Sequence, residues 1–363
     1  MTLAARSSRL TLLAVVLAFA GCLGLGPRSI SRDRVDYHAA LGDTQKEQAL
    51  LNIVRLRYVD VPVFLDVAQI VSGYTLESSV SGVGTIFGFR GAVPGVPDNS
   101  VALGAQGKLT DRPTITYVPL SGAQLAKNIL VPLPPALILF LIQAGWPADI
   151  VFSIAVDAIN GLQNHVGAPS RFHPGDPEFV RLLQLVRQVQ RSSSVGMQVE
   201  RAKDGSEHVT LAFRRRSVAP AGAKDVADLK AILGLHPEKW EFRVRFGTYP
   251  AENDEIALLT RSMAKIMVQL ALDVDVPAAH LAERRAAPIP AEDHVRREPL
   301  MRIGSSVDRP ADAFVAVRYR EHWFWVDDRD LASKQTFAFL LFLFSLADTG
   351  GKETLPLITI PAG

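Results

Sequence analysis

Apolar and polar residues alternate with two different periods along this chain, and the change of period marks its organisation. From Asp43 to Tyr58 the apolar residues recur every three to four positions. This spacing predicts a helix with a buried stripe that Asp43 caps. Between residues 72 and 118 the period becomes two, and the composition turns to Gly, Ser, Thr and Val. The alternation predicts one long hairpin whose strands are joined by a loop near residues 94–99.

The rest of the chain mixes helical and strand patterns without a regular strand–helix–strand repeat. We expect helices at residues 121–164, 176–191, 223–235, 253–274 and 330–348, and strands at 196–216, 239–247, 300–306, 312–320, 322–328 and 354–362. This order predicts an α+β fold, in which antiparallel hairpins and small sheets pack with buried helices beside one long Gly/Ser-rich hairpin. We place an N-terminal region at residues 36–168, which includes the hairpin and a helix pair at 121–164, and a C-terminal region at 169–363.

The most apolar part of the helix pair, residues 137–159, is too interrupted to cross a membrane. A spanning helix needs about 20 apolar residues, and residues 145–147 (Gly-Trp-Pro) divide this run. Asp149 and Asp157 would also be costly in lipid. We therefore expect two buried antiparallel helices here.

The N-terminus has the pattern of a secretory signal peptide. Arg6 and Arg9 precede an apolar run from Leu10 to Gly21. The run is too short to span a bilayer, and it ends in small residues. We expect residues 1–21 to be the signal peptide.

Cys22, the only cysteine among 363 residues, follows this run directly. The segment Phe19-Ala20-Gly21-Cys22 resembles the lipobox of bacterial lipoproteins, although the first position of that motif is usually Leu. The resemblance implies that Cys22 is the lipid attachment site and that residues 22–35 tether the lipid to the fold. Leu23 in place of Asp favours the periplasmic face of the outer membrane, by the same resemblance. The alternatives are an uncleaved anchor or a cleaved signal with an incidental cysteine.

Three segments of the mature part resemble uncharacterised proteobacterial envelope lipoproteins. They are EQALLNIVRLRYVDVPVFLDV, RPTITYVPLSG and HWFWVDDRDLASKQTFAFLLFLFSL. The resemblance implies a similar fold and a Gram-negative envelope, and it brings no activity and no site residues.

Composition narrows the classes of partner. A single cysteine excludes an internal disulfide, so a core must stabilise the mature chain. An apolar fraction of 48% and a charged fraction of 21% fit a globular protein. The net charge is +2, and the clusters Arg214–Arg216 and Arg296–Arg297 are short. We therefore expect no nucleic acid among the partners.

No catalytic or cofactor motif is complete. GAQGKLT at residues 104–110 lacks the first Gly and the last Ser or Thr of a phosphate-binding loop. Glu321 and His322 are a candidate acid/base pair, for which a strand turn is the plainer interpretation. We therefore assign no catalytic residue and no cofactor.

Two charged groups need a structural explanation. Asp327, Asp328 and Asp330 resemble a calcium site, but their place before a helix favours capping, so we assign no metal. Arg55, Arg57 and Arg261 lie in helices that otherwise look buried, where a guanidinium needs a carboxylate or carbonyl partner. Asp66, Asp157 and Glu255 are the candidate carboxylates.

The predicted hairpin is the feature by which we weigh the competing functions. We expect a lipid-anchored, non-enzymatic envelope protein that binds, scaffolds or assembles, with an envelope protein or further copies as partner. One alternative is a subunit of an oligomeric outer-membrane channel that inserts the 72–118 hairpin, with Phe87, Phe89 and Tyr117 at the membrane interfaces. A second alternative is a periplasmic hydrolase.

Overall fold

The computed structural model describes residues 25–71, 74–86, 99–111, 114–168, 171–173, 175–192, 195–201, 207–213, 220–289 and 299–347. The predicted signal peptide and the predicted strand at 354–362 lie outside these residues. The chain divides into two compact units. Unit 2 is Val63–Ser121, and unit 1 is the chain before and after it. Helices and sheets of both orientations confirm the predicted α+β class.

The main sheet of unit 1 has six strands in the order β6-β5-β12-β11-β10-β9. Their bounds are β5 Val156–Ile159, β6 Leu162–Gln163, β9 Val195–Arg201, β10 Glu207–Phe213, β11 Glu241–Phe246 and β12 Glu255–Thr260. All neighbours run antiparallel except β11 and β12, which run parallel. Strands β5 and β12 are buried almost throughout, and their residues are mostly apolar apart from Asp157, Glu255 and Thr260.

The helices predicted across β5 and β12 are wrong. Helix α5 (Ala148–Ala155) ends where β5 begins, although the sequence pattern continues to residue 164. Residues 253–274 do not form one helix, because β12 precedes α8 (Met263–Ala271). Short apolar runs that are buried on both faces carry no clear period, so a strand and a helix look alike in them.

The turn after β5 has a sequence signal for a hairpin, Asn160-Gly161, which the hydrophobic periodicity of this region does not reveal. Asn160 and Gly161 both have left-handed backbones, with φ of 48° and 88°, as an Asn-Gly hairpin turn requires. The Asn160 side chain also fixes the turn, since its Nδ2 donates to the Leu233 carbonyl (2.8 Å) and its Oδ1 accepts from the Ala257 N–H (2.7 Å).

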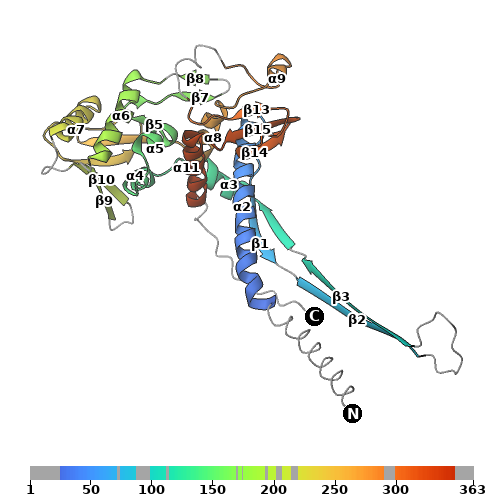
Figure 1. Cartoon of the computed structure of the whole chain (residues 1–363). Coiled ribbons are helices and arrows are strands. Elements are labelled where there is room, and N and C mark those ends of the chain that lie inside the picture. The colour runs from blue at the N-terminus through green and yellow to red at the C-terminus, as the bar shows by residue number, and fades with distance from the viewer. Residues whose placement is uncertain are drawn as a thin grey trace. The chain divides into compact units, whose positions relative to one another are not determined.

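Helices form the second layer of unit 1. Their bounds are α2 Leu25–Arg57, α3 Gly122–Leu125, the π-helical turn η2 Ala126–Leu130, α4 Pro135–Gln143, α6 Pro177–Arg191, α7 Pro220–Ile232, α9 Ala278–Ala282 and α11 Leu331–Ala347. Helix α6 lies between α5 and α7 (Figure 1). Helix α8 packs against α2, and Leu50, Ile53, Ile266 and Leu270 of this pair are fully buried. Each such side chain stabilises the fold by about 1.5–3 kcal/mol.

Helix α2 is longer than predicted. It begins at Leu25, so Asp43 is not its N-cap and instead pairs with Lys46 at 2.6 Å. Residues 25–35 of the predicted tether are therefore helical. Among residues 35–57, whose burial is described, the first buried residue is Ala49.

A second sheet of unit 1 confirms the strands predicted near the C-terminus. It contains β13 (Gly304–Ser306), β14 (Ala313–Tyr319) and β15 (His322–Asp327) in the order β13-β15-β14. Arg320 and Glu321 form the two-residue turn between β14 and β15, both with positive φ. Helix α2 contacts β14 and β15, and α11 contacts α2 and β15.

Unit 2 is the predicted long hairpin, and the structure gives its register. Strand β1 (Leu65–Val71) pairs with β4 (Thr114–Pro119), and β2 (Tyr74–Ile86) pairs with β3 (Asn99–Asp111), both antiparallel (Figure 1). Val71 pairs with Thr114, and Tyr74 pairs with Asp111. The step between these pairs is three residues on each strand, so the two ladders share one register.

The boundary predicted between residues 168 and 169 does not separate the two units. It falls in a small hairpin of β7 (Val166–Ala168) and β8 (Arg171–His173), between the helices predicted at 121–164 and 176–191. The six-stranded sheet takes strands from both sides of it. The division in the structure instead isolates residues 63–121 from the rest.

Candidate functional site

The predicted lipid attachment site, Cys22, lies outside the described residues, so its modification stays a prediction. Among the described residues no helix combines the length and the apolar character needed to cross a membrane. The described part of the chain offers three places to examine for function: two polar clusters in unit 1 and the hairpin of unit 2.

The first polar cluster joins three elements that are far apart in the sequence. Tyr58, just after α2, places its hydroxyl 2.7 Å from Nδ1 of His280 on α9, in a buried setting. The His280 ring stands edge-on to His322 at the start of β15, with centroids 4.7 Å apart. Tyr319, at the end of β14, contacts the Tyr58 ring at 5.3 Å between centroids.

Burial sets the protonation of this cluster. Burial raises the pKa of Tyr58 to about 12, so the phenol keeps its proton at neutral pH. Burial also lowers the pKa of His280, and the neighbouring His322 and Arg285 lower it further. The His280 imidazole is therefore neutral at neutral pH, and its Nδ1 shares a hydrogen bond with the protonated Tyr58 hydroxyl.

An exposed ion pair closes the cluster on its outer side. Tyr319 donates its hydroxyl to Asp60, and Arg320 pairs with the same carboxylate at 3.3 Å. The hydrogen bond from Tyr319, and then Arg320, hold the pKa of Asp60 below its usual value. The Arg320 guanidinium also lies 5.1 Å from the Tyr58 ring centroid, a cation–π distance.

These contacts make the first cluster a structural latch. The Tyr58 hydroxyl, the His280 ring and the Asp60 carboxylate are each engaged by a side chain from another part of unit 1. Of the candidate pair, Glu321 lies in the β14–β15 turn and His322 begins β15, as the plainer interpretation expects, and no hydrogen bond joins the two described side chains. The latch ties the end of α2 to α9 and β14.

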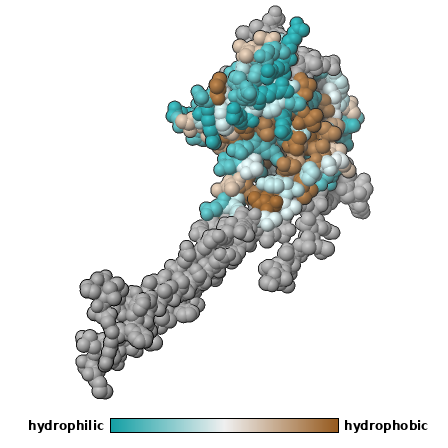
Figure 2. Space-filling model, turned by 90° about the vertical axis from the view of Figure 1, so that its right-hand side faces the viewer, coloured by the Kyte–Doolittle hydropathy of each residue, from teal (hydrophilic) through white to brown (hydrophobic). Residues whose placement is uncertain are grey.

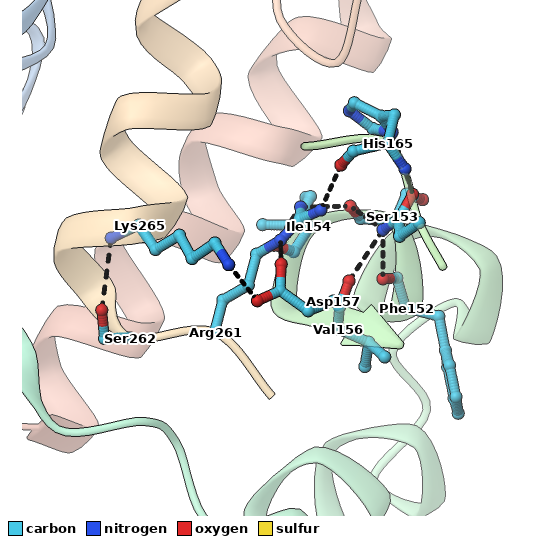
Figure 3. Close-up of polar contacts among 10 residues, drawn as sticks. Phe152, Ser153, Ile154, Val156, Asp157, His165, Arg261, Ser262 and Lys265 are labelled. Carbon is cyan, nitrogen blue, oxygen red and sulfur yellow. Dashed lines mark hydrogen bonds and ion pairs between the residues drawn. The ribbon is translucent and has the colours of Figure 1, made fainter. Parts of the chain in front are cut away.

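The second polar cluster surrounds Arg261, which has no exposed surface (Figure 3). Its Nε donates to Asp157 at 2.7 Å, its Nη1 to the carbonyls of Ser153 and Ile154, and its Nη2 to the carbonyl of His165. Lys265 pairs with the other oxygen of Asp157. This confirms Asp157 as the partner among the three candidate carboxylates.

The charged groups of the Arg261 cluster are hydrogen-bonded to other groups of the protein. The guanidinium donates to one carboxylate and three carbonyls, and both Asp157 oxygens accept from cations. Buried Asn164 beside it donates to the carbonyls of Phe152, Ser153 and Val156. The network therefore fixes α5, β5 and α8 relative to one another, which is a stabilising role.

The other two arginines are placed differently. Arg57 donates to the carbonyl of Ala287 at 2.7 Å, so a carbonyl partner is confirmed, while its Nε and Nη1 are buried without a hydrogen-bond partner. Burial lowers the pKa of Arg57. Arg55 lies 3.5 Å from Oδ1 of Asn52. Glu255 pairs with Arg243 and Arg245 instead.

The acidic residues before α11 act as the capping interpretation predicts. Asp330 accepts from the N–H and the hydroxyl of Ser333, which is an N-cap contact. Asp328 pairs with Lys334, and Asp327 accepts from the Arg329 N–H. The described residues contain no group of three or more His, Cys, Asp or Glu that suits a metal ion.

The segment that resembles a phosphate-binding loop, residues 104–110, lies inside β3. A strand offers no helix N-terminus to an anion, so this interpretation fails for the reason the sequence suggests. A cavity of about 460 Å³ beside α2 and β14 is lined by charges of both signs, Asp43, Lys46, Glu47 and Arg309. Those charges include the Lys46–Asp43 pair, so they neutralise one another more than they select a ligand.

The third place is the ribbon β1–β4 of unit 2, which differs from both clusters. All six residues of β4 are exposed, on both faces of the ribbon. Its exposed apolar residues are Leu65, Ile115, Tyr117 and Val118. On the part of unit 1 drawn in Figure 2, apolar patches lie among hydrophilic residues, as on most folded proteins. A ribbon that is uncovered on both faces is unusual, and it makes unit 2 the candidate interface.

Sequence reasoning found the hairpin but missed the latch. Tyr58, His280 and Tyr319 are 39 to 261 positions apart, and no local motif links them. The pair Glu321–His322 was the only signal near the latch. In comparisons with known proteins, no family model, curated protein or solved structure matches this chain.

Proposed function

We propose that this protein is a lipid-anchored component of a bacterial envelope that works without catalysis, by association through its hairpin unit. The lipobox-like segment that ends at Cys22 supports the envelope location, and unit 2 supports the mode of action. The periplasmic hydrolase alternative has no support among the described residues, whose polar clusters are internally paired.

The observation that carries this proposal is the uncovered ribbon. Each of its two sheets has only two strands among the described residues, so no described third strand pairs with the outer edge of β1 or of β4, and such an edge can pair with a strand of another chain. An isolated two-stranded hairpin is marginally stable in water. Long strands of this kind persist when another surface covers them, so the hairpin is the part of the protein that needs a partner.

A crosslinking experiment in cells tests the association. A photo-crosslinking amino acid replaces Tyr117, half exposed on β4, and in a matched control it replaces Val180, which is 61% exposed on α6. We expect discrete adducts from position 117 and only background from position 180. Equal background at both positions, with the protein folded and in the envelope, would contradict the proposal.

The anchor is tested separately. The variant Cys22→Ser, expressed in cells fed with labelled palmitate, is expected to lose both the label and its sedimentation with membranes, because a thioether needs the sulfur. Retention of label by Cys22→Ser would show that the lipid is elsewhere.

A further inference from the structure

We propose that the hairpin β2–β3 enters a lipid bilayer, together with the hairpins of further copies of this chain, as a closed ring of strands. This inference rests on the proposed function and deepens it, because it names lipid as the partner of one hairpin face and identical hairpins as the partners of its two edges. Three features carry it: the segregation of residue types by register, the length of the ladder, and the unpaired edges.

The register places apolar residues opposite apolar residues. Directly paired positions of an antiparallel ladder share one face of the ribbon, and each face recurs every second residue. One face therefore takes the pairs Leu76–Leu109, Ser78–Gly107, Val80–Ala105, Gly82–Leu103 and Gly84–Val101. Across these five pairs the face has no charged residue and one hydroxyl. We call it the apolar face.

The opposite face carries most of the polar residues of the ladder, together with one apolar pair, Val83–Ala102. It takes the pairs Thr75–Thr110, Glu77–Lys108, Ser79–Gln106, Ser81–Gly104, Val83–Ala102 and Thr85–Ser100. The charged residues of β2 and β3 are Glu77, Lys108 and Asp111. The first two pair across the polar face, and Asp111 lies on the apolar face, in the last pair of the ladder, beyond the five pairs that carry no charge. A slip of one residue would mix the two faces, so it is the observed register that separates them.

This separation is the pattern of strands with lipid on one side and water on the other. A hairpin that rested on a protein core would need only a few apolar pairs. In this hairpin the five consecutive pairs of the apolar face carry no charged residue, and the opposite face carries most of the polar residues.

The length of the ladder matches a bilayer. Strands β2 and β3 have 13 residues each, or about 44 Å at about 3.4 Å per residue. A strand that spans the membrane needs about 9–11 residues when it is tilted by about 45°. Each strand therefore crosses the hydrocarbon with a margin at both ends, where Tyr74, Asp111 and Asn99 belong to the outermost pairs.

The unpaired edges decide that insertion requires several copies. In lipid a backbone N–H or C=O without a partner is very costly, and a lone hairpin has a row of them on each side. Its two edge strands run in opposite directions, so the β2 edge of one copy can pair antiparallel with the β3 edge of the next. This head-to-tail pairing closes into a ring. Closed sheets in membranes have at least about eight strands, so the ring takes at least about four copies.

The base of the ribbon, β1–β4, keeps apolar residues at exposed positions. Ile115 and Tyr117, two positions apart and thus on one face, are 40% and 50% exposed, and Thr114 and Thr116 occupy the other face. The pattern of the β2–β3 ladder therefore continues in residues whose exposure is known. Phe87 and Phe89, the other aromatic residues suggested for the interfaces, lie outside the described residues.

Thiol labelling in vesicles tests the inference. The full-length lipidated chain, reconstituted in vesicles of phosphatidylethanolamine and phosphatidylglycerol, receives single cysteines at Val80 or Leu103 on the apolar face and at Ser79 or Ser81 on the polar face. Each is labelled with an environment-sensitive fluorophore. The chain with no added cysteine is the control and should not label, because the lipid occupies Cys22.

We expect a lipid-attached quencher to suppress the emission at Val80→Cys and Leu103→Cys, and an aqueous quencher to act on Ser79→Cys and Ser81→Cys. Crosslinks at position 117 without lipid quenching at any hairpin position would overturn the membrane inference and leave the proposed function intact. Absence of both would contradict both proposals. Quenching at both faces alike would also overturn the inference, because it implies a ribbon lying in the interface.

A pair of charge variants gives an independent readout, release of a dye trapped in the same vesicles. Val80→Lys places a charge on the apolar face, and we expect it to reduce the rate of release at least about tenfold. Ser79→Lys, one residue away on the polar face, is expected to release dye at about the parent rate. Equal effects of the two variants would overturn the inference, and unchanged thermal unfolding of unit 1 shows that both chains are folded.

Discussion

The two units of this protein obtain their stability in opposite ways. Unit 1 buries complete side chains between α2 and α8 and in its six-stranded sheet, and even its charged Arg261 is enclosed and hydrogen-bonded at all three guanidinium nitrogens. The ribbon of unit 2 exposes all six residues of β4. Both units belong to one chain and have similar apolar content. The difference in burial therefore comes from how the apolar residues are arranged along the sequence.

The comparison shows which unit is self-sufficient. In unit 1 the polar groups of the latch and of the Arg261 network serve the fold, because their partners lie within the same unit. In unit 2 no described strand pairs with the outer edges of its two-stranded sheets. Substitutions should therefore change folding in unit 1 and association in unit 2, and four predictions follow that contrast from large effects to small ones.

Removal of the buried guanidinium should have the largest effect on folding. Arg261→Met leaves Asp157 without its main partner in a buried place, which costs about 3–5 kcal/mol. Chemical denaturation, followed by circular dichroism, measures the free energy of unfolding. The control is Lys265→Met, which removes the exposed cation of the network and should cost at most about 1 kcal/mol. Equal losses in both variants would contradict the role given to Arg261.

Truncation of an apolar residue should matter in one unit and not in the other. Leu50→Ala, in the core between α2 and α8, should lower the free energy of unfolding by about 2–5 kcal/mol. Ile115→Ala on the exposed ribbon should change it by at most about 0.5 kcal/mol in the dispersed protein. A large loss for Ile115→Ala under those conditions would mean that unit 2 has a core of its own.

Loss of one hydroxyl should weaken the latch moderately. Tyr58→Phe keeps the ring contacts and removes the hydrogen bond to His280, which should cost about 1–2 kcal/mol. Tyr319→Phe is the matched comparison, because its hydroxyl serves the exposed carboxylate of Asp60, and its cost should be smaller. Thermal unfolding of both variants gives the ranking, and a reversed ranking would sink the account of the buried bond.

The buried histidine should make stability depend mildly on pH. The pKa of His280 is lower in the folded protein than its usual value of 6.5, so the unfolded chain binds the proton more readily. Stability is then complete above about pH 6.5 and declines as the pH falls below it. His280→Gln, which keeps an acceptor for Tyr58, should flatten this decline. The groups near His280 are Tyr58, Glu283, Arg285, Arg320 and His322.

An unchanged pH profile in His280→Gln would assign the decline to another group. Denaturation at several pH values between about 7.5 and 5.5 distinguishes the two outcomes.

Sequence patterns predicted the amphipathic and alternating elements well, for physical reasons. Helix α6 and strand β15 bury one face and leave the other more accessible, which imprints a period on the sequence, and the residue types of β2 and β3 alternate along the hairpin of unit 2. Strands β5 and β12 are buried on both faces, so their sequences show no such period. The Asn160–Gly161 turn was the one local signal that could have revealed β5.

The candidate sites were less accessible from the sequence. The capping role of Asp330 is local, so its position before α11 predicted it. The latch depends on Tyr58, His280 and Tyr319, which only the packing of α2, α9 and β14 brings together. The separation of the hairpin faces depends on register, which the alternation permits and only the pairing of β2 with β3 determines.

Hydrogen exchange of the hairpin backbone tests the central claim most directly, because it reports whether unit 2 is stable by itself. Peptides covering residues 74–86 and 99–111 are followed in the lipidated protein, once dispersed as a monomer in detergent and once assembled in vesicles. The account predicts fast exchange in the monomer and strong protection in vesicles, while peptides of α8 stay protected in both. Equal protection of the hairpin in the dispersed monomer would contradict it, since the ribbon would then need no partner.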